Sequence, residues 1–250
     1  MISELCAATV RHRHVVLLLG LLVAVVNAAT IGLTPALGQT LFFPLVLITL
    51  AVLVLSVVAM GIRPASFVVL PHVPAFATPP PAWKVFLALG VLWPNSASLG
   101  ALVRSTRADI VSTLDVVLAL AWVVAVTLLL IDVWRDNEVQ LRPYGIRQSW
   151  PLGSLTVPWE ALPAAQLRPG TDRPSRLRMA FAQPLLVKRC GIPWSRNALR
   201  TDNVDARFLA AAIRHYVCRP EYRTAIGSQT EYKRLLIELA NRQDGADRAD

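Results

Sequence analysis

Residues 15–62 read VVLLLGLLVAVVNAATIGLTPALGQTLFFPLVLITLAVLVLSVVAMGI, and none of their side chains is charged. A helix needs about 20 apolar residues to cross the hydrocarbon core of a bilayer, so this stretch is long enough for two crossings. The proline and glycine within residues 34–39 predict a tight turn between them. We therefore expect one membrane span at about 15–33 and a second at about 41–62.

A secretory signal peptide is the alternative explanation of the first span. Arg11 and Arg13 form a basic flank before it, and Ala28 and Ala29 could serve as the small residues of a cleavage site. A signal peptide has an apolar core of about 7–15 residues, whereas this apolar run continues past Ala29 into the next one. We favour a retained span preceded by a basic N-terminal flank, residues 1–14.

The composition agrees with a membrane protein. Of the 250 residues, 54% are hydrophobic and 16% are charged, whereas soluble domains carry about 25% charged residues. The formal net charge is +9 and the mean hydropathy is +0.49. These values exclude a disordered or fibrous chain and argue against a wholly soluble protein.

Two further spans complete a transmembrane region that we predict at 15–132. The span at about 110–131 carries no charge between Asp115 and Asp132. The segment at about 85–103 is interrupted by Trp-Pro-Asn-Ser, so it is either a kinked span or a re-entrant segment. We favour the span, because neighbouring helices can satisfy the backbone groups that a proline frees.

The proline-rich residues 64–83 are expected to form an interfacial loop between the second and third spans. Trp83 and Lys84 are suitable anchors at its boundary with the membrane. The charges of such a loop also bear on the orientation of the chain, because short loops on the cytoplasmic side of a membrane carry an excess of Lys and Arg.

Four spans give an uneven distribution of basic residues. One side would carry Arg11, Arg13, Arg63, Lys84, Arg135, Arg142 and Arg147, and the other side Arg104 and Arg107. A three-span chain would divide these residues more evenly and place the C-terminal part outside. We therefore expect a multi-pass protein of the cell membrane with both termini in the cytoplasm.

Residues 133–217 have the pattern of a small α+β domain. Val139, Leu141, Ile146, Leu155 and Val157 alternate with polar neighbours, as in half-buried strands, and Trp159 continues the pattern. Arg176–Phe181 is the clearest further strand. Residues 205–217 have helical periodicity, with Asp202 or Asn203 expected as the N-cap.

Residues 218–250 are predicted to be a helical appendage with a polar tail from residue 244. Ser228 and Glu231 have the spacing of a capping box, and Tyr232, Leu235, Leu236 and Leu239 form one apolar stripe. His215 is expected on the exposed side of the preceding helix. Trp150, Trp159 and Trp194 are expected in the core and at the rim of the β domain.

The segments Val139–Ile146 (VQLRPYGI) and Val157–Leu162 (VPWEAL), followed by a closing helix, resemble the bacterial PH-like (pleckstrin-homology-like) domains that follow membrane spans. The resemblance covers residues 133–217. It implies an antiparallel β barrel or sandwich closed by a helix, which acts as a scaffold for lipid, peptide or protein contact without catalytic residues. The first hairpin lacks a clear basic pair of the kind that binds phosphoinositides, so inositol-lipid binding is not implied.

Two groups of residues are candidate sites. The first is a possible lipid or partner surface formed by Arg176, Arg178, Lys188, Arg189 and Arg196. Attraction to anionic lipid headgroups beside a membrane anchor explains this basic surface better than nucleic-acid binding does. The alternative that it is an ordinary solvated face remains open. The second is a possible intramembrane polar site at Asp115 and Asn95, since acids within a span are functional candidates. Asn27 and Asn95 are more simply explained as interhelical hydrogen-bond formers.

The sequence contains no nucleotide-binding, zinc-protease, serine-hydrolase or Cys-x-x-Cys motif. We therefore expect no enzymatic activity, no catalytic residue, no metal and no cofactor. The predicted function is that of an integral membrane protein presenting a PH-like interaction domain at the inner membrane surface, as a scaffold or sensor. Its partners would be the bilayer, its anionic headgroups or a membrane-associated protein. The alternative is a small transporter or channel subunit that uses residues 85–103 and Asp115.

Overall fold

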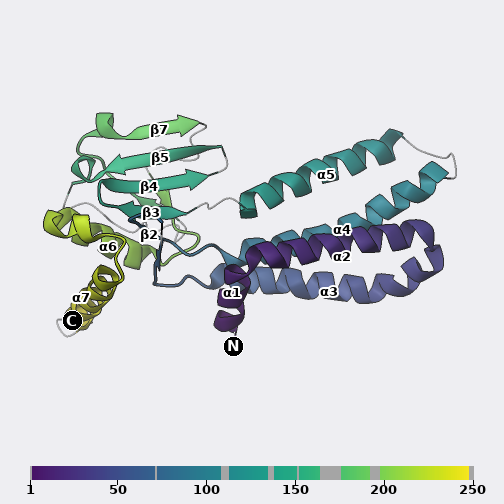
Figure 1. Ribbon diagram of the computed structural model, residues 1–250, viewed down its shortest axis with the longest axis horizontal. Coiled ribbons are helices and arrows are strands. Elements are labelled where there is room, and N and C mark those ends of the chain that lie inside the picture. The colour runs from purple at the N-terminus through teal and green to yellow at the C-terminus, as the bar shows by residue number, and fades with distance from the viewer. Residues whose placement is uncertain are drawn as a thin grey trace. The chain divides into compact units, whose positions relative to one another are not determined.

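The computed structural model describes residues 2–70, 72–107, 113–134, 138–150, 152–163, 176–191 and 198–247. The chain divides into two compact units, each of them assembled from two separate segments (Figure 1). The helical unit consists of Met1–Ile62 and Pro81–Arg135. The sheet unit consists of Arg63–Pro80 and Asp136–Asp250.

The described part of the helical unit is built around α4. Its helices are α1 (Ile2–Arg11), α2 (Arg13–Leu33), α3 (Pro35–Gly61), α4 (Ala82–Arg107) and α5 (Thr113–Trp134). The α4 helix contacts each of the other four. Close approach depends on small residues: a Cβ added at Gly100 of α4 would lie 2.9 Å from the carbonyl oxygen of Ala28 in α2. Small residues at such crossings are typical of helices that pack within membranes.

Two described helices are long and apolar enough to cross a bilayer, namely Arg13–Leu33 and the Phe43–Gly61 part of α3. They coincide with the helices predicted at 15–33 and 41–62. The turn between them is shorter than expected, because only Thr34 separates the two helices. Pro35 begins α3, which is possible because the missing N–H of a proline at the first helical position would have no intrahelical partner anyway.

The interruption predicted within residues 85–103 does not break α4, which is continuous from Ala82 to Arg107. Side chains near Pro94 supply local hydrogen bonds. The Ser96 hydroxyl donates to the Trp93 carbonyl at 2.5 Å, and the Asn27 amide of α2 donates to Ser96 Oγ at 2.6 Å. The interhelical role predicted for Asn27 is thereby confirmed. The helix predicted at 110–131 is α5, which is described from Thr113 and ends at Trp134.

The sheet unit is an antiparallel sheet covered by helices. Six strands pair in the order β1-β2-β3-β4-β5-β7, and β6 pairs with β8. The strands are β1 (Val68–Val69), β2 (Phe76–Ala77), β3 (Val139–Arg142), β4 (Gly145–Trp150), β5 (Gly153–Pro158), β6 (Arg176–Arg178), β7 (Lys188–Gly191) and β8 (Ala198–Arg200). The pairing of these described strands does not close into a barrel.

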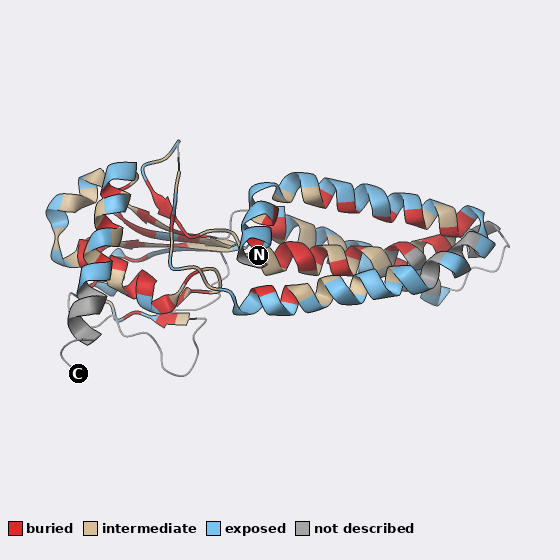
Figure 2. Cartoon of the chain, turned by 90° about the horizontal axis from the view of Figure 1, so that it is seen from below, coloured by how far each residue is buried: buried red, intermediate tan, exposed pale blue. Residues whose placement is uncertain are grey.

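One hydrophobic core holds the sheet unit together (Figure 2). The helices that contribute to it are α6 (Ala206–Cys218) and α7 (Gln229–Asp247). The alternation predicted for β3, β4 and β5 is confirmed, because the apolar positions face the core. Its fully buried side chains include Leu141, Ile146, Leu155, Val157, Leu177, Leu199, Leu209, Ile213 and Leu235.

Trp159 is 1% exposed and belongs to this core, as predicted, but it lies in a 3₁₀ turn, η1 (Trp159–Ala161), rather than in a strand. Its indole N–H donates to the carbonyl oxygens of Arg142 and Pro143, at 3.0 Å each. The core therefore fixes the β3–β4 turn. Trp150 is partly buried against the core, and Trp194 lies outside the described residues.

Residues 64–80 are not a loop between spans but a part of the sheet unit, which corrects the prediction of one uninterrupted transmembrane region. Phe76 pairs with Leu141 and is completely buried. The Phe67 N–H donates to the Tyr232 hydroxyl at 3.0 Å. The prolines prevent a helix here, but very short strands between prolines can still pair.

The C-terminal helix α7 is an integral part of the sheet unit rather than an appendage, because Leu235 and Leu239 enter the core. The turn before α7 contains Gly227, which has φ +99°. Its lack of a side chain lets the turn approach residues 63–80, since a Cβ at Gly227 would lie 2.5 Å from Cα of Pro74. Ser228 accepts a hydrogen bond from the Glu231 N–H, as expected of the capping residue. The helix extends to Asp247, beyond the predicted start of the tail.

Two predictions about α6 are wrong. Its N-cap is Asp205, whose carboxylate accepts from the Phe208 N–H at 2.8 Å, whereas Asp202 pairs with Arg200. His215 is completely buried rather than exposed. It lies between α6 and α7, a contact that could not be anticipated while residues 218–250 were taken for an appendage.

The sheet unit should lose stability when a core side chain of residues 63–80 is replaced by a smaller one. We expect Phe76→Ala to lower the free energy of unfolding by about 3–5 kcal/mol, because it removes a fully buried ring. Val68→Ala on β1, where the side chain is 46% exposed, is the matched control. The measurement is denaturant unfolding of the full chain followed by tryptophan fluorescence. An equal effect of the two substitutions would contradict the placement of residues 63–80 in this unit.

Candidate functional site

The outer surface of the helical unit is strongly apolar. Large hydrophobic side chains of α2, α3 and α5 are exposed along the length of each helix (Figure 2). Among them are Leu18, Leu22, Val26, Leu47, Leu50, Val57, Val117, Leu120, Val124 and Leu128. Soluble monomers rarely expose contiguous apolar patches larger than a few hundred Å². This surface therefore fits an apolar environment and not water.

A partly buried ion pair links the first turn of α4 to the last turn of α5. Lys84 Nζ lies 2.7 Å from Asp132 Oδ2, and the Lys84 side chain is 7% exposed. The Lys84 ammonium group thus faces a carboxylate within the helical unit, and its role as an interfacial anchor stays a prediction. A charged pair of this kind is directional and fixes how the two helix ends meet.

The predicted intramembrane polar site cannot be described at the level of side chains. Asn95 lies on α4 and Asp115 on α5, but both side chains lie outside the described residues. Their proximity therefore stays a prediction.

The predicted basic surface is divided between different sheet faces. Leu177 of β6 points into the core, so Arg176 and Arg178 point to the opposite face of their two-stranded sheet. Lys188 of β7 pairs with Thr156 and lies on the outer face of the six-stranded sheet.

Arg189 pairs instead with the buried Leu155 and turns toward the other face, where its guanidinium lies 6.0 Å from the Phe181 ring. Arg196 lies outside the described residues. The described members of this predicted surface therefore do not share one face, because neighbouring residues of a strand point in opposite directions.

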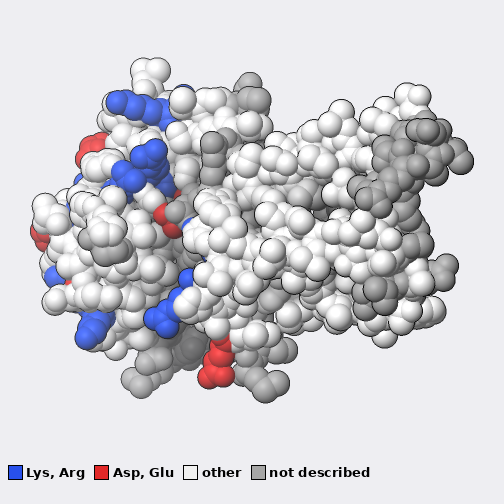
Figure 3. Space-filling view, turned by 45° about the vertical axis from the view of Figure 1, so that its right-hand side comes forward, with Lys and Arg blue, Asp and Glu red and all other residues white. Residues whose placement is uncertain are grey.

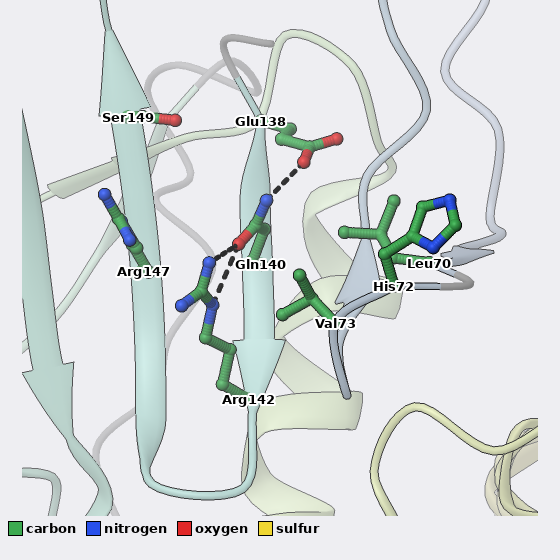
Figure 4. A pocket seen from close by; sticks show the side chains of 8 residues that line it. All are labelled: Leu70, His72, Val73, Glu138, Gln140, Arg142, Arg147 and Ser149. Atoms are coloured by element: carbon green, nitrogen blue, oxygen red, sulfur yellow. Dashed lines mark hydrogen bonds between the residues drawn. The ribbon is translucent and has the colours of Figure 1, made fainter.

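A polar groove in the sheet unit was not anticipated. It encloses a cavity of about 370 Å³ between β3, β4 and the turn that follows β1 (Figure 4). The residues that line it are Leu70, His72, Val73, Glu138, Gln140, Arg142, Arg147 and Ser149. The groove thus combines residues that precede α4 in the sequence with residues that follow α5.

A chain of hydrogen bonds runs along β3 inside the groove. The Gln140 amide N–H donates to Glu138, and Gln140 Oε1 accepts from Arg142 Nε at 2.9 Å and also from Arg142 Nη2. Because a carboxylate only accepts and a guanidinium only donates, the orientation of the Gln140 amide is unambiguous. Arg142 Nη1 donates to the Tyr144 hydroxyl at 2.5 Å. The Arg142 guanidinium is therefore held in place by neighbours on the same hairpin.

Arg147 lies directly across from Gln140 in the β3–β4 register and is exposed. No hydrogen bond or ion pair joins its guanidinium to any residue in the described part of the chain. The hairpin thus carries two guanidinium groups in one groove. The expectation that they are not a basic pair of the kind that binds phosphoinositides stays a prediction. The strand register, rather than the spacing in the sequence, brings them together.

A second polar cluster connects α6 with α7. Tyr216 donates to Glu231 Oε1 at 3.1 Å, Glu231 also pairs with Arg234, and Arg219 lies 2.5 Å from Glu238. Burial first, and then the charge of Glu231, raise the pKa of the Tyr216 hydroxyl above its usual value. Tyr216 therefore remains a proton donor, and the cluster locks the two helices together. Within the described residues, no group of His, Cys, Asp and Glu side chains is arranged to hold a metal ion.

The Lys84–Asp132 pair should contribute to the stability of the helical unit. We expect Lys84→Met to lower the free energy of unfolding by about 1.5–3 kcal/mol, the usual range for a hydrogen bond between charged groups. In an Asp132→Leu background the same substitution should cost far less, because the partner is already absent. Lys233→Met, at an exposed position of α7, is the control. The free energy of unfolding of the two single variants, the double variant and the control is measured in detergent. Equal effects of Lys84→Met in the native and the Asp132→Leu chain would contradict the coupling of Lys84 with Asp132.

We compared the chain with models of protein families, with curated proteins and with solved structures, and none of them matches.

Proposed function

We propose that the protein is an integral membrane protein that presents a PH-like interaction domain at the inner membrane surface, as a non-catalytic scaffold or sensor. The observation that carries this proposal is the contrast between the two units. The helical unit exposes long rows of apolar side chains, whereas the sheet unit buries its apolar side chains in a core of its own. On the face in Figure 3, Lys and Arg gather over the sheet unit and the helices carry little charge.

The pairing of β2 with β3 supports four crossings over three. Both strands belong to one sheet, so residues 63–80 and 136–250 must be on the same side of any membrane that the chain crosses. The segment between them contains α4 and α5. Because a chain that leaves one side and returns to it crosses an even number of times, α4 and α5 cross together or not at all.

The exposed apolar residues of α5 favour crossing. Leu114, Leu120 and Leu128 are each more than 60% exposed in the helical unit, and lipid would cover them at no cost in free energy. The central α4 is less apolar, but its neighbours cover most of it. The sheet unit carries Arg63, Arg142 and Arg147, and the positive-inside rule assigns their side of the membrane to the cytoplasm.

The PH-like assignment of the sheet unit is supported by its consecutive hairpins β3-β4-β5 and by α6, which packs on their apolar face. The extra strands β1 and β2 and the helix α7 extend this core beyond residues 133–217. A scaffold role is favoured by the fixed position of such a domain, since tethering raises the local concentration of its ligands at the membrane. The transporter alternative would use residues 85–103 and Asp115, and the Asp115 side chain lies outside the described residues. In the described part of α4, Ser96 bonds to Asn27 of α2.

Topology can be tested by single cysteines in a chain that carries Cys6→Ser, Cys190→Ser and Cys218→Ser. We expect Val68→Cys and Tyr144→Cys, both exposed in the sheet unit, to react with an impermeant maleimide from the same side, namely the cytoplasmic one. Ala36→Cys and Ala108→Cys, which follow α2 and α4 in the sequence, should react from the opposite side. The measurement is labelling in right-side-out and inverted vesicles.

Each other outcome of this labelling has a definite meaning. Reaction of positions 68 and 144 from opposite sides would contradict the assembly of the sheet unit. Reaction of position 108 from the same side as position 68 would contradict the crossing of α4 and α5. Extraction of the full chain into buffer by alkaline carbonate would contradict membrane insertion itself.

A further inference from the structure

We propose that the polar groove of the sheet unit binds a phosphoryl group, on a soluble phosphate compound or on a lipid headgroup, through Arg142 and Arg147. The inference deepens the proposed function, on which it rests for the idea that the sheet unit is a binding module. Its evidence lies entirely within that unit. Phosphoryl binding can therefore be disproved while the proposed membrane topology holds, and the topology can be disproved while phosphoryl binding holds.

The register of the β3–β4 hairpin places the two arginines within reach of one anion. Arg142 pairs with Gly145 and Gln140 pairs with Arg147, so Arg142 and Arg147 are diagonal neighbours. Diagonal neighbours of an antiparallel pair lie about 7–8 Å apart and are within reach of long side chains. Alternation puts both arginines on the outer face of the sheet, and both line the same cavity (Figure 4).

Arg142 is oriented in advance for an anion. A guanidinium has five N–H donors, and the bonds of Arg142 to Gln140 and Tyr144 employ three of them. One N–H on each of Nη1 and Nη2 then stays available to donate to the oxygens of an oxyanion. Because the neighbours already hold the side chain, binding there would cost little side-chain entropy.

Arg147 supplies the second charge. Its guanidinium bonds to no described residue, although Gln140 and Arg142 surround it on the same face. The carboxylate among the residues that line the groove belongs to Glu138, which is 8% exposed and accepts from Gln140. The charge of Glu138 is thus engaged along β3, and the two arginines leave an excess of positive charge in the groove.

The number of donors favours a phosphoryl group over a carboxylate. Two guanidinium groups, with the Ser149 hydroxyl and the His72 ring on the same lining, offer more donors than the two oxygens of a carboxylate can use. A phosphoryl group has three oxygens that spread around the phosphorus and can meet donors from β3 and β4 together. The volume of about 370 Å³ lies within the range of small-molecule sites. It has room for a phosphoryl group with a small substituent, but not for a folded partner.

The test uses the full chain purified in a neutral detergent. Inorganic phosphate and glycerol 3-phosphate probe the soluble source by isothermal titration calorimetry. Dioctanoyl phosphatidic acid in the same micelles, against dioctanoyl phosphatidylcholine, probes the lipid source. We expect saturable binding of at least one phosphate monoester, weakened by salt because the groove attracts it by charge. Binding of the soluble compounds supports a soluble ligand, and binding of phosphatidic acid alone supports a headgroup.

Arg147→Gln should weaken binding by about tenfold or more, since it removes a charge-assisted contact, and Arg142→Gln/Arg147→Gln should abolish it. Arg178→Gln, the same change at an exposed position of β6, should have no effect. Arg147 bonds to no described residue, so its single variant should fold, as near-ultraviolet circular dichroism can verify. The proposal is overturned if no probe binds the native chain, or if the double variant binds as well as the Arg178 variant.

Discussion

The backbone pairing between β2 and β3 is the constraint on which the architecture depends. Phe76 and Ala77 pair with Leu141 and Gln140, and the Thr78 N–H donates to the Val139 carbonyl at 2.9 Å. The Thr78 hydroxyl accepts in turn from the Val139 N–H at 3.1 Å. This short ladder joins two segments that are separated in the sequence by two helices. It makes residues 63–80 a part of the sheet rather than a loop, and it restricts how α4 and α5 can meet a membrane.

Much of the fold could be predicted from patterns that are local in the sequence. The uncharged run from residue 15 to 62 marked two helices, and alternation located the strands that contain Leu141, Ile146 and Leu155. The capping of α7 by Ser228 was predicted from the capping-box spacing of Ser228 and Glu231. Such features depend on neighbours within one turn or one strand, and single-sequence reasoning captures them well.

What escaped prediction depends on contacts that are distant in the sequence. A strand of two residues, such as β2, is too short to have a periodicity, and its identity comes from its partner β3. The burial of His215 similarly requires knowledge that α7 packs beside α6. The candidate site shows the same limit: the basic residues grouped by sequence proximity are separated by strand alternation, whereas Arg142 and Arg147 are brought together by register. Only the pairing of strands distinguishes these two outcomes.

The discontinuous sheet unit has a consequence for biosynthesis. Residues 63–80 are synthesised before α4 and α5, but their partner β3 is synthesised after both. The sheet therefore cannot be completed while α4 and α5 are being translated, and the edge of β2 that pairs with β3 must wait for its partner. Such non-local pairings form slowly, and unpaired strands are prone to misassembly meanwhile. The brevity of β1 and β2 limits this hazard, because a two-residue strand offers little edge for another chain to join.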